Sequence, residues 1–155
     1  MLGKPVTDFS LPSTGGTPFR LSEHLGSKLV LYFYPKDNTP GCTTQGAEFR
    51  DAYQAFRKAG ATVVGVSRDS IKSHEGFRAK MEFPFELICD ADEKLCTQFD
   101  VIKMKNMYGK QVRGIERSTF LIDPAGKLAR EWRKVKVDGH VDEVLAAVQS
   151  LGTSD

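Results

Sequence analysis

Cysteine is scarce in this chain of 155 residues, which contains only Cys42, Cys89 and Cys96. The count is odd and the spacing irregular, which argues against a disulfide framework. No Cys-x-x-Cys pair is present. The six residues between Cys89 and Cys96 fit no common zinc arrangement with a histidine, so no metal site is expected. The sequence therefore predicts a protein that works with reduced thiols, as in the cytoplasm.

Long hydrophobic runs and a strong net charge are also missing. No apolar stretch approaches the roughly 20 residues of a membrane span, and Met1–Pro5 lacks the apolar region of a secretory signal. A net charge of +2 creates too weak a field to suggest nucleic-acid binding. With no internal repeat, low-complexity tract or linker, we expect one domain over residues 1–155, with neither nucleic acid nor membrane as partner.

The most informative stretch surrounds Cys42. An apolar, aromatic and β-branched run, Leu29–Tyr34, predicts a buried strand, and Pro35 ends it because proline has no N–H for a central ladder. Thr39 and Pro40 then predict a helix start, with Thr39 as N-cap and Pro40 at the first helical position. Cys42 therefore falls in the first helical turn, where free N–H groups and the helix dipole favour a thiolate.

The rest of the chain alternates between strand-like and helix-like segments. A strand–helix–strand order implies parallel pairing through a right-handed crossover, so the pattern predicts an α/β domain with a central mixed sheet flanked by helices. The expected elements are a small N-terminal hairpin turning at Gly15–Gly16, strands at 61–67, 85–88, 118–123 and 128–132, a helix from Asp69 or Ser70 to about Lys80, a short helix starting at Asp90 with Leu95, Cys96 and Phe99 inward, and a last helix from about His140 closed by Gly152.

Two local expectations concern polar side chains. His74 is placed on the outward side of its helix and is expected to be exposed. Residues 103–117 hold five basic residues against the single acid Glu116, which is typical of a solvated loop. A strand follows from Ser118, so the last of these basic residues, Arg117, stands at a strand entrance.

The pattern Pro35-x-x-x-Thr39-x-x-Cys42 resembles the peroxiredoxin signature, and more narrowly that of the bacterioferritin comigratory protein, or Q-type, subfamily. The resemblance extends over nearly the whole chain, including Asp8–Pro12, Gly65–Asp69, Arg117–Asp123 and the closing helix. It implies a thioredoxin-like fold of the peroxiredoxin type. It also implies a thiol-dependent peroxidase for hydrogen peroxide and organic hydroperoxides that needs no metal, haem or flavin cofactor.

The resemblance implies a role for each site residue. Cys42 would be the nucleophile that becomes a sulfenic acid. Thr39 would hydrogen-bond the peroxide and the thiolate, and Pro35 would shield the sulfenic acid from water. Arg117 would stabilise the thiolate and donate to the transferred oxygen, and the N–H groups of Gly41 and Cys42 would support charge on the leaving oxygen. Each residue also has a plainer interpretation. Thr39 is a good N-cap, Arg117 without the resemblance is a surface cation, and Cys42 could be an inert small hydrophobe, although its place at the helix head favours a reactive thiol.

Many Q-type members carry a resolving cysteine five residues after the nucleophile, where this chain has Ala47. Two cycles therefore remain open. An external thiol from a thioredoxin, glutaredoxin or glutathione system could reduce the sulfenic acid, or Cys89 or Cys96 could resolve it, which requires Cα atoms within about 7 Å. In either cycle we expect the helix head to unwind locally and present Cys42.

Two other function classes stay open at this point. One is a thioredoxin-like disulfide oxidoreductase, against which the missing Cys-x-x-Cys argues. The other is a redox-sensing or chaperone binding module that captures a partner through Cys42 with little peroxide turnover. Q-type proteins are often monomers and no feature of the sequence demands a partner subunit, so a monomer is expected.

Overall fold

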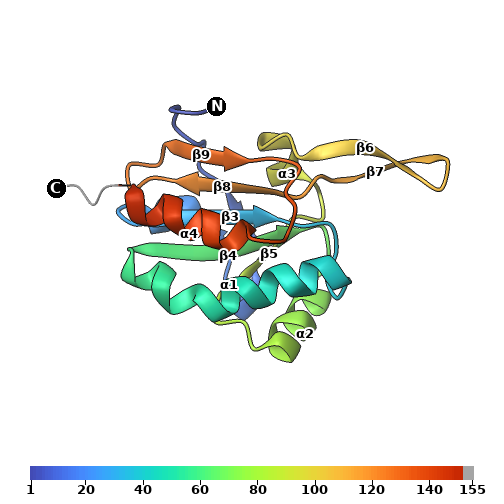
Figure 1. The fold of residues 1–155 in the computed structure, drawn as a ribbon, viewed down its shortest axis with the longest axis horizontal. Coiled ribbons are helices and arrows are strands. Elements are labelled where there is room, and N and C mark those ends of the chain that lie inside the picture. Colours follow the sequence, from blue (N-terminus) through green and yellow to red (C-terminus); the bar gives the residue numbers. More distant parts are fainter. Residues whose placement is uncertain (152–155) are drawn as a thin grey trace.

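A five-stranded mixed sheet forms the centre of the protein in the computed structural model, which describes residues 1–151 (Figure 1). The strand order is β5-β4-β3-β8-β9, in which β3, β4 and β5 are parallel, β8 is antiparallel to β3 and β9 is antiparallel to β8. The predicted mixed sheet is thus confirmed. Its strands are β3 (Lys28–Phe33), β4 (Ala61–Ser67), β5 (Leu87–Cys89), β8 (Ser118–Ile122) and β9 (Leu128–Trp132).

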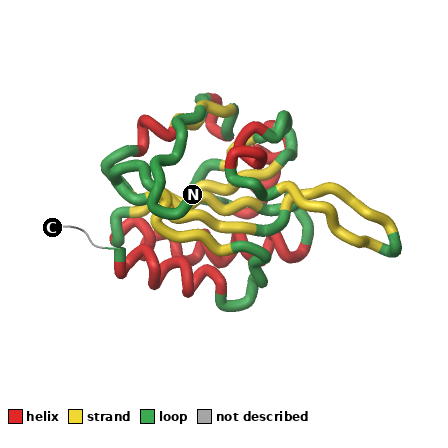
Figure 2. Tube along the Cα trace, turned by 90° about the horizontal axis from the view of Figure 1, so that it is seen from above, coloured by secondary structure: helices red, strands yellow, loops and turns green. Residues whose placement is uncertain are grey.

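Elements cover both faces of the sheet, as the view in Figure 2 shows. One face packs against α1 (Pro40–Lys58), α2 (Ile71–Met81) and α4 (His140–Ser150). The other face carries α3 (Lys94–Gln98), the 3-10 turn η2 (Leu21–His24), and the predicted N-terminal hairpin of β1 (Ser10–Leu11) and β2 (Phe19–Arg20). The 3-10 turn η1 (Thr14–Gly16) lies beside β5 and contacts α2. Successive side chains of β3 therefore enter opposite cores, and all of them are buried.

The buried Lys28 joins the two long helices on one face. Its Nζ donates to the carbonyl oxygen of Ala59 at 3.0 Å and to that of Val148 at 2.9 Å. These carbonyls lie at the C-terminal ends of α1 and α4, where a cation is favoured by the unpaired carbonyl groups and the helix dipole. The contact fixes the far end of the helix that begins beside Cys42.

The expectation of a loop over residues 103–117 is wrong. The segment forms a hairpin of β6 (Ile102–Met107) and β7 (Lys110–Ile115) that extends away from the sheet (Figure 1). Most of its side chains are exposed on both faces, the apolar Met104, Met107 and Val112 included, so no buried apolar face marks it as a strand pair. The backbone pairing and the turn at Tyr108 and Gly109, which both have positive φ, hold it together.

The expectation that His74 is exposed is also wrong, since its side chain is 0% exposed. The buried face of α2 is formed by His74 and Phe77, while Ile71 and Met81 are only half-buried. The ring finds polar partners in the interior, and these offset the cost of burying its nitrogens. Ser70 caps α2 by accepting from the Ser73 N–H, as one of the two predicted caps.

The short helix α3 begins at Lys94, later than predicted. The carboxylate of Asp90 accepts from the N–H groups of Leu95 at 3.0 Å and Cys96 at 2.7 Å, so it caps the helix across a wider turn than a capping box spans. The expected burial of Leu95, Cys96 and Phe99 is confirmed. Gly152, the predicted end of the last helix, lies outside the described residues, as do residues 153–155. Within residues 1–151, no helix is long and apolar enough to cross a bilayer.

His140 at the start of α4 predicts a loss of stability in acid. Its Nε2 lies 2.8 Å from Thr119 Oγ1, and burial lowers the pKa of His140 from 6.5 to about 4. In the unfolded chain His140 binds a proton as the pH falls through about 6.5, whereas in the folded chain it binds one only as the pH approaches about 4. Stability is therefore retained above that pH and lost as the pH falls toward 4, by about 2–3 kcal/mol at pH 4.5.

Urea unfolding at pH 7 and pH 4.5 measures this loss. The variant His140→Gln lacks the titrating ring, so its stability should fall less between the two values than that of the wild type. Equal falls in both proteins would contradict the assignment.

Candidate active site

Cys42 is the third residue of α1, at the sheet edge where β3 ends, and is 2% exposed. The first helical hydrogen bond runs from the Thr43 N–H to the Thr39 carbonyl at 2.8 Å. Among the residues described, the N–H groups of Gly41 and Cys42 precede that bond and have no backbone acceptor. The helix head therefore offers two donors and the positive end of its dipole to the sulfur or to an oxygen beside it.

Arg117 reaches this helix head from a distant part of the chain. Ser118, the first residue of β8, pairs with Phe33, the last residue of β3. Arg117 thus emerges beside the end of β3, and its Nη2 lies 3.4 Å from Cys42 Sγ. A permanently charged guanidinium at that distance stabilises a thiolate over a thiol. Gly41 keeps the approach open, because a Cβ there would stand 3.2 Å from the same nitrogen.

Gln45 is a site residue that the sequence reasoning missed. It is fully buried, and its Oε1 accepts from Arg117 Nη1 at 2.6 Å. A carboxamide can orient the guanidinium without cancelling its charge. Gln45 lies three residues after Cys42, so helical spacing alone places both on one face, and this was the available signal.

Lys105 places a second cation near the site. It lies half-buried on β6, and its Nζ donates to the Ile115 carbonyl. Burial and the neighbouring Arg117 lower the pKa of Lys105. The sequence reasoning places this lysine in a solvated loop, which the structure corrects.

Thr39 and Pro35 occupy the predicted segment between β3 and α1, with a detail that differs from expectation. Thr39 has the extended backbone of an N-cap, but its side chain does not cap the helix. The hydroxyl instead donates to the Lys36 carbonyl at 2.8 Å, because that acceptor lies within the preceding turn. No hydrogen bond of the described chain joins this hydroxyl to Cys42. Pro35 is half-buried, and its shielding role stays a prediction.

Cys89 and Cys96 do not join this site. Cys89 is half-buried at the end of β5, two strands from β3, which corresponds to about 9–10 Å at the usual strand spacing. Cys96 is fully buried in the core on the opposite face of the sheet from Cys42. Burial, and then the adjacent Asp90, raise the pKa of the Cys96 thiol far above its ordinary value. All three cysteines are free thiols.

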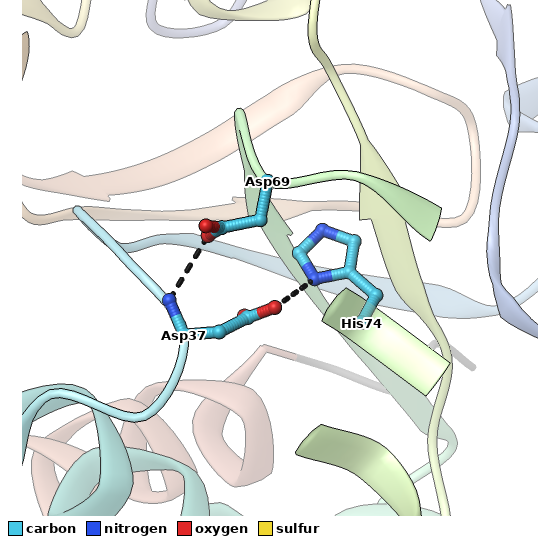
Figure 3. A group of neighbouring side chains, drawn as sticks. All are labelled: Asp37, Asp69 and His74. Carbon is cyan, nitrogen blue, oxygen red and sulfur yellow. Dashed lines mark hydrogen bonds and ion pairs between the residues drawn. The ribbon is translucent and has the colours of Figure 1, made fainter. Parts of the chain in front are cut away.

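Asp37, Asp69 and His74 form a second polar cluster at the same sheet edge (Figure 3). One potential ligand atom from each lies within 4.8 Å of the others, a spacing that a metal site would also have. Asp37 and His74 contact each other directly, and the Asp37 N–H donates to Asp69. The three residues are therefore partners of one another, and sequence reasoning identified none of them as part of the site.

Comparison with known proteins places this geometry in context. The sequence profile described as the AhpC/TSA family matches residues 2–131. The chain is 58% identical over 152 residues to Peroxiredoxin Bcp of Xanthomonas campestris pv. campestris, covering 97% of this chain and 95% of that protein. It is 47% identical over 150 residues to Peroxiredoxin Bcp of Bacillus subtilis, covering 97% and 96%.

A solved structure is similar over most of the chain. It is that of a bacterioferritin comigratory protein of Xanthomonas campestris, studied for alkyl peroxide reduction through trapped intermediate and ligand complexes. The two structures superpose with a TM-score of 0.88 at 58% identity, covering 92% of this chain and 90% of the other.

Proposed function

Because the chain belongs to the AhpC/TSA family, and within it to the Bcp and Q-type peroxiredoxins, which are thiol peroxidases, we propose that Cys42 is the sulfur that reduces the peroxide. One observation carries the proposal. Cys42 Sγ stands at the head of α1 with Arg117 Nη2 at 3.4 Å. This is an electropositive setting that favours the thiolate, which is the reactive form of cysteine.

The proposed first step transfers one oxygen atom. The Cys42 thiolate attacks the terminal oxygen of ROOH, an S–O bond forms, the O–O bond breaks, and RO⁻ leaves and takes a proton to become ROH. The Arg117 guanidinium and the N–H groups of Gly41 and Cys42 support the charge that develops on the oxygens. In the same proposal, Thr39 orients the peroxide and Pro35 shields the sulfenic acid. Thr39 can do so only after its hydroxyl leaves the Lys36 carbonyl.

Both hydrogen peroxide and organic hydroperoxides are proposed as substrates. Each presents the same terminal –OOH group to Cys42, and the distal substituent leaves with the second oxygen. The alkyl peroxide reduction studied for the Xanthomonas campestris relative supports the organic class.

We further propose that an external thiol completes the cycle. Such a thiol attacks the Cys42 sulfenic acid and releases water, and a second thiol then reduces the mixed disulfide to the free cysteine. Ala47 cannot resolve the intermediate, Cys96 is buried on the other face, and Cys89 is two strands away. The fitting reductants are a thioredoxin, glutaredoxin or glutathione system, acting on a monomer in the cytoplasm.

Intact mass with cysteine mapping, after one equivalent of hydrogen peroxide is added to the reduced protein, tests this function. We expect one added oxygen on Cys42 and no loss of two hydrogens. A double variant, Cys89→Ser with Cys96→Ser, should keep its peroxide turnover with dithiothreitol within about threefold, since neither thiol takes part.

Other outcomes separate the alternatives. A disulfide between Cys42 and Cys89 or Cys96 would replace the one-cysteine cycle by an intramolecular one. An unmodified Cys42 would overturn the peroxidase assignment of this residue. A mixed disulfide with a captured partner and little peroxide turnover would instead indicate a redox-sensing binding module.

A further inference from the structure

Asp37 lies five residues before Cys42, in the segment that connects β3 to α1, and its side chain is 1% exposed. Its Oδ1 accepts from the Tyr34 hydroxyl at 2.6 Å. Its Oδ2 accepts from Ser73 Oγ at 2.7 Å and lies 2.8 Å from His74 Nδ1. Its own N–H donates to Asp69 Oδ2 at 2.9 Å. Asp37 is thus anchored to the end of β3, to α2 and to the segment that follows β4 (Figure 3).

The two ring nitrogens of His74 each face an oxygen. Nε2 lies 3.0 Å from the Ile88 carbonyl, and Nδ1 lies 2.8 Å from the Asp37 carboxylate. Burial alone would raise the pKa of Asp37, but hydrogen bonds from His74, Tyr34 and Ser73 hold it below its ordinary value. Asp37 is therefore a buried carboxylate held by three side-chain partners.

A buried carboxylate of this kind resists the loss of its partners. Removing a partner leaves Asp37 charged and desolvated, which is far more costly than losing an exposed salt bridge. Asp37 belongs to the segment that leads into the helix head, whereas His74, Ser73 and Asp69 belong to the body of the fold. Asp37 therefore fastens the segment before Cys42 to elements that are themselves packed against the sheet.

This fastening matters because the two halves of the proposed cycle have opposite needs. Attack on a small peroxide needs Cys42 in place at the helix head, beside Arg117 and the free N–H groups. Reduction of the sulfenic acid by a thiol needs the sulfur outside, and Cys42 is only 2% exposed. The helix head must open between the two steps, and whatever fastens the preceding segment controls that opening.

We propose that Asp37 and His74 form a latch that holds the segment before Cys42 closed on α2 and sets the balance between peroxide attack and sulfenic acid reduction. Both are positioning residues, because they touch neither substrate nor sulfur. The proposal rests on the proposed function of Cys42. The same latch accounts for the cluster without a metal ion, since its ligand atoms already serve one another.

The variant Asp37→Asn tests the latch. The substitution is nearly isosteric, but it removes the carboxylate charge. Asparagine has a single acceptor oxygen, which cannot accept from Tyr34 on one side and from Ser73 and His74 on the other. Hydrogen exchange should become about tenfold faster at the N–H groups of position 37 and Thr43, while β3 and β8 keep wild-type protection. The rate constant for peroxide attack should fall about tenfold, and that for sulfenic acid reduction by dithiothreitol should rise.

Further variants separate a latch from general destabilisation. His74→Gln should act in the same direction as Asp37→Asn, and Ser73→Ala, which removes one of the donors to Asp37, should have a smaller effect. The matched control is His140→Gln, a second buried histidine that contacts Thr119 instead of this segment. It should lower thermal stability while both half-reaction rates stay near wild type.

Two results would overturn the latch. One is unchanged exchange at position 37 and Thr43 in folded Asp37→Asn and His74→Gln proteins. The other is a parallel fall of both half-reaction rates. If wild-type Cys42 forms no sulfenic acid, the proposed function fails. Hydrogen exchange at position 37 and Thr43 alone would then decide whether the latch exists.

Discussion

Replacing Cys42 by serine is expected to abolish peroxide reduction, with a loss on the order of 10⁴-fold or more in turnover. A serine hydroxyl stays protonated near neutral pH, so the helix head and Arg117 have no anion to stabilise. Attack by its oxygen would also produce another O–O bond, with no thermodynamic gain. Hydrogen peroxide consumption with dithiothreitol as the reductant measures the effect.

The controls for this prediction are the other two sulfurs. Cys89→Ser and Cys96→Ser change the same functional group, one half-buried at the end of β5 and one in the opposite core. Each single variant should keep turnover within about threefold of wild type, once corrected for the fraction folded. Substantial turnover in Cys42→Ser would mean that another group reacts with peroxide, and the assignment would be wrong.

Arg117→Met is expected to lower the second-order rate constant for peroxide by about 10²–10³-fold. Methionine keeps much of the volume but loses both the charge 3.4 Å from Cys42 Sγ and the donors that face the transferred oxygen. Alkylation of Cys42 by iodoacetamide at neutral pH should slow as well, because less of the sulfur is present as thiolate. Stopped-flow mixing of reduced protein with peroxide provides the rate constant.

Two comparisons make the Arg117 prediction specific. Arg117→Lys keeps a positive charge but loses the two guanidinium nitrogens that contact Gln45 and Cys42 at the same time. It should therefore recover only part of the rate constant for peroxide. Arg113→Met removes an equal charge from β7, where Arg113 pairs with Glu93 on the surface, and should react nearly as fast as wild type. An equal loss of the rate constant in Arg113→Met and Arg117→Met would indicate an effect of the overall electrostatic field instead of a direct contact of Arg117 with the sulfur.

The helix head around Cys42 was predictable from the sequence because its signals are local. Pro35 ends a buried strand, Pro40 stands at the first helical position, and Cys42 therefore falls within the first turn. The α/β order of strands and helices and the N-terminal hairpin were predictable for a related reason, since turn residues and apolar periodicity report on neighbouring residues in the chain. The thioredoxin-like type of the fold came from the family resemblance.

The hairpin over residues 102–115 and the buried His74 were not predictable in this way. Each face of the hairpin mixes apolar and polar side chains and is largely exposed, so the sequence shows no apolar face turned toward a core. Apolar periodicity treats histidine as a surface residue, while His74 is held inside by Asp37, 37 positions away. A partner so distant leaves no trace in the helix pattern.

Short stretches of sequence were therefore sufficient to predict the strand, the turn, the helix start and the place of Cys42, because these features depend on propensities and caps within a few residues. The surroundings of the sulfur depend on segments that meet after folding. Arg117, 75 positions from Cys42, reaches it because Ser118 pairs with Phe33. Asp37 reaches His74 because α2 packs beside the end of β3. Strand register and helix packing minimise the free energy of the whole core, and no short segment contains that information.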